Sequence, residues 1–150
     1  MAIDCKKNDK YSYYNQLRIL NSMRVKKISL KEVMEKRRMK SELIDVVNKA
    51  LSGISSECRV VFRSSCPCCT LCSLHQLVPW VEERRLDGAV YWSEQDEEEY
   101  CETGELFVRF FIIKEGLKLG EKIKEILERH GIEVSWDGNY RQVITVKGFK

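Results

Sequence analysis

The chain has 150 residues, of which 43% are hydrophobic and 33% are charged, and its formal net charge is only +3. This length and balance are typical of a globular domain that buries its own core, and they exclude a wholly disordered chain. No apolar run approaches the roughly 20 residues of a membrane span, so the sequence predicts no contact with a membrane.

Charged side chains are unevenly distributed along the chain. Residues 1–40 hold twelve Lys and Arg against four Asp and Glu, whereas residues 82–105 hold ten acidic residues against two arginines. A block of like charge usually forms a solvated face. The sharper interpretation is that residues 6–40 form a basic arm that binds nucleic acid or an acidic protein. A third interpretation is that the basic block and the acidic block contact each other, within one chain or between the two chains of a homodimer.

The first part of the chain predicts helices. Apolar residues at helical spacing predict an amphipathic helix over residues 11–23. Ser29 and Glu32 form a capping-box pattern that opens a long helix, and Gly53 ends this helix. We therefore expect a basic, helical N-terminal segment over residues 1–57.

The middle of the chain alternates between expected strands and helical turns. Residues 58–63 and 89–92 are short β-branched and aromatic runs, which predict strands. A helix is expected to begin between them, inside a cysteine-rich segment, and Pro79 should end one helical turn and open the next. Residues 94–104 are expected to form an acidic connection.

The last part of the chain predicts three further strands and one helix. Residues 106–113 form a strongly apolar strand, and an amphipathic helix follows between Gly116 and Gly131. Two closing strands are expected over residues 132–136 and 143–147.

The order of these elements predicts an α+β fold. We expect residues 58–150 to form a domain around a mainly antiparallel sheet of about five strands. Helices should pack on one face of this sheet, with the N-terminal helices added to it.

Four of the seven cysteines and one of the two histidines lie within ten residues. The segment reads Cys66-Pro67-Cys68-Cys69-Thr70-Leu71-Cys72-Ser73-Leu74-His75. Thiolates and imidazoles are ligands that zinc prefers, and a structural zinc ion takes four of them. Candidate ligands recur at every third residue, so several could share one side of a turn or helix. They are Cys66, Cys69, Cys72 and His75, with Cys68 or Cys101 as substitutes.

Two other interpretations of this cysteine segment stay open. Its C-x-x-C pairs lie where a strand meets a helix start, and a helix N-terminus lowers the pKa of a thiol and favours thiol–disulfide chemistry. A thioredoxin fold is disfavoured, because it needs a proline well downstream and the chain has none after Pro79. In the third interpretation, the cysteines are inert side chains that pack a tight turn.

The start of the chain predicts its compartment. Residues 1–7 lack the apolar core of a signal peptide. We therefore expect an intracellular, cytoplasmic protein. In a reducing compartment its cysteines should be thiols or metal ligands rather than structural disulfides.

Three segments follow one another within residues 58–147. They are the Cys-Cys-x-x-Cys segment at residues 68–72, the strand that leads into Gln95-Asp96, and the Gly-x-x-Val-x-Trp-Asp-Gly motif at residues 131–138, before the closing strand. In this order they resemble a family of small uncharacterised proteins, most of them bacterial, with no established activity. Residues 1–57 lie outside this resemblance. Their Lys/Arg-rich character resembles small proteins of large DNA viruses, which would place the protein in a virion or viral factory.

The sequence holds no nucleophile elbow, phosphate loop, metalloprotease helix or kinase motif, which disfavours an enzyme. We expect a non-enzymatic binding or assembly protein, a homodimer, whose cysteine segment is structural or holds zinc. One alternative is a thiol-redox or zinc-dependent protein that uses residues 66–72. Another is a nucleic-acid-binding protein that uses the basic N-terminal helices.

Overall fold

The protein is described by a computed structural model, which covers residues 29–138 and 143–150. The helix expected over residues 11–23, and the part of the basic arm before residue 29, lie outside the described residues. No described helix is both long and apolar enough to cross a membrane. In chain order, the described elements are α2 (Leu30–Ser52), the 3-10 helix η1 (Ile54–Ser56), β1 (Val60–Cys66), α3 (Thr70–Glu83), β2 (Gly88–Ser93), α4 (Glu94–Thr103), β3 (Leu106–Ile112), α5 (Leu119–Arg129), β4 (Ile132–Ser135) and β5 (Val143–Phe149).

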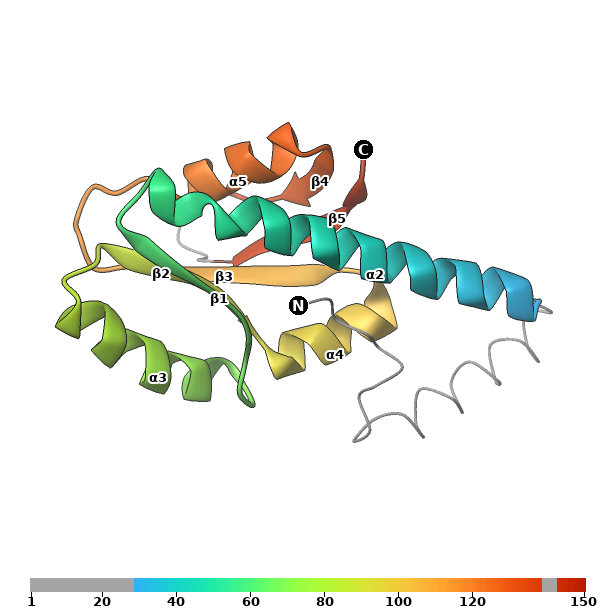
Figure 1. Cartoon of the computed structure of the whole chain (residues 1–150), viewed down its shortest axis with the longest axis horizontal. Helices are drawn as coiled ribbons and strands as arrows, with labels where there is room; N and C mark the ends of the chain where they lie inside the picture. Colours follow the sequence, from blue (N-terminus) through green and yellow to red (C-terminus); the bar gives the residue numbers. More distant parts are fainter. Residues whose placement is uncertain (1–28, 139–142) are drawn as a thin grey trace.

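One five-stranded sheet forms the centre of the fold (Figure 1), with the strand order β1-β2-β3-β5-β4. β1 and β2 run parallel, and each of the other neighbouring pairs is antiparallel. The expected α+β class, with a mainly antiparallel sheet of five strands, is therefore confirmed. The strand order leaves β1 at one edge of the sheet and β4 at the other.

The helices cover both faces of this sheet, which differs from the expectation of helices on one face. Figure 1 shows α2 and α5 on one side of the sheet and α3 on the other. Two parallel strands need a connection that crosses over a face of the sheet, and α3 is that crossover between β1 and β2. Apolar side chains are therefore buried on both faces.

Two apolar clusters stabilise the two faces. The larger cluster joins α2 and α5 to inward-facing residues of all five strands, and Ile44, Val47 and Trp92 are fully buried within it. The smaller cluster lies beneath α3 and centres on Leu77 and Tyr91. Because α2 packs in the same core as the sheet, this core extends across the boundary expected between residues 57 and 58.

α2 begins and ends where the sequence predicts. The Ser29 hydroxyl accepts a hydrogen bond from the backbone N–H of Glu32 at 3.2 Å, which satisfies one of the free donors of the first turn. Gly53 follows the last turn as the C-cap. The first half of α2 extends beyond the sheet (Figure 1), where Leu30 is 60% exposed.

A connection and the position of a proline differ from the prediction. Residues 94–104 are not an irregular connection, because Ser93 and Asp96 form a reciprocal capping box that opens α4. Gly104 ends α4 with a left-handed φ of 81°. Pro79 lies inside α3 and does not end a helical turn.

Candidate functional site

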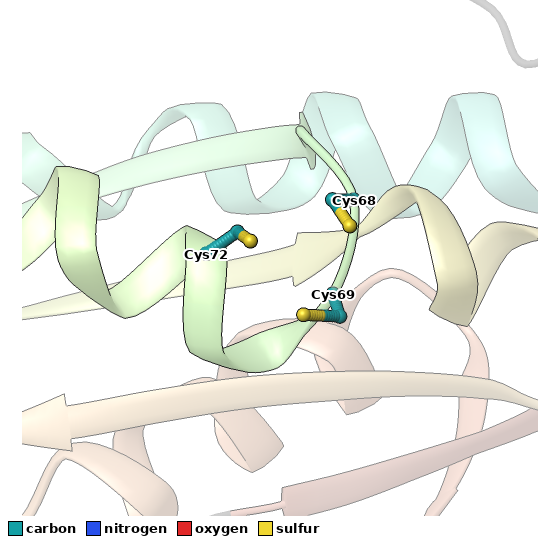
Figure 2. Close-up of side chains that lie close together, drawn as sticks. All are labelled: Cys68, Cys69 and Cys72. Atoms are coloured by element: carbon teal, nitrogen blue, oxygen red, sulfur yellow. The ribbon is translucent and has the colours of Figure 1, made fainter.

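Three cysteines converge where β1 connects to α3. Cys68 lies in the connection, Cys69 is the N-cap residue of α3, and Cys72 lies in its first turn. Their sulfur atoms all lie within 4.8 Å of one another. Figure 2 shows the three side chains around one point at the start of α3. We call these three residues the cysteine group.

The backbone of the β1–α3 connection positions the cysteine group. Ser65 and Cys68 have positive φ angles of 55° and 69°, which side chains other than glycine adopt infrequently. The first angle accompanies the irregular pairing of β1 with β2 between Arg63 and Cys66. Cys69 returns to an extended conformation before the helix begins. The chain therefore turns twice in four residues and brings the Cys68 sulfur close to those of Cys69 and Cys72.

Hydrogen bonds to α4 and β2 hold this connection in place. The backbone N–H of Gln95 donates to the carbonyl oxygen of Cys68 at 3.1 Å. The Ser65 hydroxyl donates to a carboxylate oxygen of Glu97, and the indole N–H of Trp92 donates to the same oxygen at 2.8 Å. Partial burial raises the pKa of Glu97. The position of Cys68 thus depends on residues far along the chain.

The thiols of the cysteine group differ in acidity. The backbone N–H of Cys72, followed by its thiol, lowers the pKa of Cys69. The neighbouring thiols of Cys72 and Cys69 raise the pKa of Cys68. An N-cap side chain faces the free N–H groups of a helix start, and these stabilise a thiolate. Of Cys68 and Cys69, Cys69 is therefore the first to lose its proton as the pH rises.

The structure does not bring Cys66 and His75 into the cysteine group. Cys66 ends β1 and is buried against Leu77 and Tyr91, where burial raises the pKa of its thiol. His75 lies on α3 and is exposed. Of the expected zinc ligands the group therefore contains two, Cys69 and Cys72, and it adds Cys68, which the sequence offered as a substitute.

Cys101, the other substitute, does not belong to the group. It lies on α4 and is bonded in a disulfide. The expectation that the cysteines are all thiols or metal ligands is therefore wrong for this residue. Cys58, Cys66 and the three residues of the cysteine group are free thiols.

The arrangement of the cysteine group suits a soft metal ion. A tetrahedral zinc ion with Zn–S bonds of about 2.3 Å holds its sulfurs about 3.8 Å apart. The observed sulfurs need to close by no more than about 1 Å to reach that spacing. Cys68 is exposed and the other two are half-buried, so a fourth ligand could approach from solvent. The group could therefore hold a metal ion through three thiolates.

Comparison with known proteins places most of the chain in a family. Residues 31–150 match the family model described as "Domain of unknown function (DUF6891)". No curated protein and no solved structure matched in the corresponding searches. The matched residues run from α2 to the end of β5 and include the cysteine group. The expected similarity to a family of unknown function is confirmed, whereas the viral resemblance of residues 1–57 stays a prediction.

Proposed function

The chain belongs to the DUF6891 family of domains of unknown function, and we propose that it is a metal-binding protein whose cysteine group holds one zinc ion. The observation that carries this proposal is the convergence of three sulfur atoms within 4.8 Å. Zinc accepts thiolate ligands and a tetrahedral geometry, and it has no redox chemistry that would consume them.

The acidity of the cysteine group supports metal binding. Metal ions bind thiolates, so each ligand must lose its proton when the ion enters. Cys69 has a lowered pKa and can provide the first thiolate. The hydrogen bonds with the Cys72 and Cys69 thiols, followed by their charges, raise the pKa of Cys68, and a bound cation would offset both by stabilising the thiolate. Zinc binding should therefore release protons and weaken as the pH falls.

The location of the cysteine group favours an exchangeable ion over one that is needed for folding. Neither apolar cluster includes Cys68, Cys69 or Cys72. Three protein ligands leave the fourth position for water or for a ligand from a partner. We therefore assign the bound ion to recognition of a partner ligand, in line with the expected binding role.

Zinc analysis of protein purified without chelator tests the proposal. We expect one zinc ion per chain, and a competition titration against a chromogenic chelator should give its affinity. Cys69→Ser and Cys72→Ser should each weaken zinc binding by more than about 100-fold, since even a lost outer-shell partner costs 10–100-fold.

Two variants serve as matched controls. Cys58→Ser removes a half-buried free cysteine outside the group and should leave zinc binding unchanged. His75→Ala tests the ligand set expected from the sequence and should also leave it unchanged. A protein that stays metal-free in zinc-saturated buffer, with the three thiols open to a thiol reagent, contradicts the proposal.

A second candidate function is thiol–disulfide exchange between Cys69 and Cys72. The lowered pKa of Cys69 at the helix start, beside a second thiol, favours it. The Cys69 thiolate would attack a small-molecule disulfide and release one thiol. The Cys72 thiolate would then attack the mixed disulfide, forming the Cys69–Cys72 bond and releasing the second thiol.

Incubation of the metal-free protein with oxidised glutathione tests this alternative. Exchange predicts that the Cys69–Cys72 peptide loses two hydrogen atoms by mass spectrometry and that two glutathione thiols are released. In Cys68→Ser/Cys72→Ser, which removes both neighbouring thiols, Cys69 should stop at the mixed disulfide. Glutathione that remains attached to Cys69 in the unaltered protein would rule out a Cys69–Cys72 disulfide and leave zinc binding.

A further inference from the structure

Five exposed cations gather around the edge strand β1 and the end of α3. They are Lys49, Arg59, Arg63, Arg84 and Arg85, which we call the basic strip. No carboxylate of the described residues lies within ion-pair distance of any of them. We propose that the basic strip binds single-stranded nucleic acid through its phosphates. This inference is independent of the cysteine group.

The centre of the basic strip is an indole that holds two guanidinium groups. The guanidinium carbon of Arg63 lies 4.8 Å from the centre of the Trp80 ring, and that of Arg84 lies 4.5 Å from it. Cation–π contacts orient a guanidinium without neutralising its charge. Arginine presents a planar set of donors that matches a phosphate. Trp80 therefore holds two phosphate-binding groups against one ring.

The basic strip continues toward the turn after α3. Arg59, just before β1, donates a hydrogen bond from its guanidinium to the backbone carbonyl of Arg85 at 3.0 Å. Arg85 has a φ of 53°, so the chain turns sharply there. Arg84 is the C-cap residue of α3 and directly precedes it. This hydrogen bond joins Arg59 to the turn that carries Arg85, next to Arg84 at Trp80, so the strip offers cations to more than one phosphate.

A groove lies beside the basic strip, between α2 and the edge of β1. It has a volume of about 490 Å³. Its lining consists of Asp45, Asn48, Lys49 and Ser52 on one face of α2 and Phe62, Arg63 and Ser64 on β1. Lys49 and Arg63 outnumber the single carboxylate of Asp45. The groove therefore extends the positive surface and lies within the range of about 300–1,000 Å³ of small-ligand pockets.

One atom in this groove lacks a partner that a ligand could supply. The side-chain nitrogen of Asn48 is buried and has no hydrogen-bond acceptor within the described structure. Buried amide donors are nearly always satisfied. The carbonyl oxygen or ring nitrogen of an unpaired base would satisfy it, because asparagine amides pair with base edges. A base that is stacked in a duplex cannot enter the groove, whereas an unstacked base of a single strand can, so the groove favours a single strand over a duplex.

A salt series tests the proposal with the full-length protein. Fluorescence anisotropy should show that a labelled 20-nucleotide single strand binds at 50 mM salt and dissociates as the salt concentration rises. Arg63→Gln/Arg84→Gln should weaken binding at least about tenfold and reduce the salt slope by about 1.4, the value for two lost phosphate contacts on a single strand. Asn48→Ala should weaken binding without changing the slope.

The matched control is Lys124→Gln/Lys147→Gln, which removes two positive charges from residues already paired with Glu128 and Glu105. This variant should bind within twofold of the unaltered protein. Residues 6–40 are the same in both double variants. A difference in their affinity for the single strand is therefore caused by the basic strip. Equal losses in both, or no binding at 50 mM salt, would overturn the proposal.

Two competitors identify the kind of polyanion. Unlabelled single strand should displace the labelled strand at a lower concentration than either the matching duplex or poly-glutamate. A duplex that competes better would overturn the preference for a single strand. Poly-glutamate that competes as well as the single strand would instead indicate an acidic protein surface as the partner.

Discussion

Asp96 and Arg109 form the most buried ion pair among the described residues. The Asp96 side chain is 4% exposed and that of Arg109 is 25% exposed. Two guanidinium nitrogens of Arg109 donate to the two carboxylate oxygens at 3.0 Å, and this pairing raises the pKa of the arginine. The same carboxylate accepts hydrogen bonds from the backbone and hydroxyl of Ser93. One side chain thus connects the start of α4 to β3.

Asp96→Ala should lower the free energy of unfolding by about 3 kcal/mol. The substitution leaves a partly buried guanidinium without its partner, and loss of one partner from a buried pair is strongly destabilising. It also removes a cap from α4. Urea denaturation followed by circular dichroism measures the change. Asp96→Asn keeps an oxygen for the cap, so its cost isolates the loss of charge.

The control is an exposed pair on the same sheet. Glu105 and Lys147 lie 2.8 Å apart with side chains about 40% exposed. Glu105→Ala should lower the free energy of unfolding by no more than about 1 kcal/mol, because water screens such a pair. If Asp96→Ala and Glu105→Ala lower the free energy of unfolding equally, burial does not determine how much the Asp96 pair contributes to stability.

At the scale of elements, periodicity predicts the strands and helices whose apolar residues face one cluster. α2, α5 and the strands were predictable for this reason, as were the ends of α2. The helix α4 was not predictable, because it contains six carboxylates and buries only Asp96 and Tyr100. The signal that could have found it is the capping pair Ser93 and Asp96. The parallel pairing of β1 and β2 was not predictable either, since no local pattern reports which strands become neighbours.

Close packing of β2 against β3 makes Gly88 sensitive to substitution. Gly88 opens β2 opposite Ile112, and an added methyl group would clash with the carbonyl oxygen of Phe111. Gly88→Ala should therefore force the two strands apart and lower the free energy of unfolding by about 2 kcal/mol. The urea midpoint measures this loss.

Gly53→Ala provides the comparison for a glycine that has room. A methyl group at Gly53 meets only the carbonyl oxygen of Ala50, at 3.8 Å, and the residue has an ordinary φ of −86°. The stability of this variant should stay within about 0.5 kcal/mol of the original protein. A Gly88→Ala variant that is equally stable would show that the β2–β3 contact adjusts without cost.

At the scale of the whole molecule, the sequence pattern predicts which residues form the apolar cores. It does not predict the surface sites, because the turns of the folded chain decide which side chains meet there. The sequence pointed to the segment between β1 and α3, where the structure brings Cys68, Cys69 and Cys72 together. It could not select Cys68 over Cys66, because that choice depends on where β1 ends and on the positive φ of Cys68. The basic strip is less predictable still. Its residues come from α2, β1 and the end of α3, and only the folded chain brings them together.

Removal of the proposed zinc ion should leave the whole fold intact. The cysteine group lies outside both apolar clusters, so neither core depends on a bound ion. Zinc at 100 times its dissociation constant would add about 2.7 kcal/mol of stability through mass action. For a chain of this size, chelation should then lower the melting temperature by about 5–10 °C and leave the circular dichroism spectrum at 25 °C unchanged. A chelated protein that is unfolded at 25 °C would show that the ion is part of the fold, as in zinc fingers, where metal binding and folding are one step.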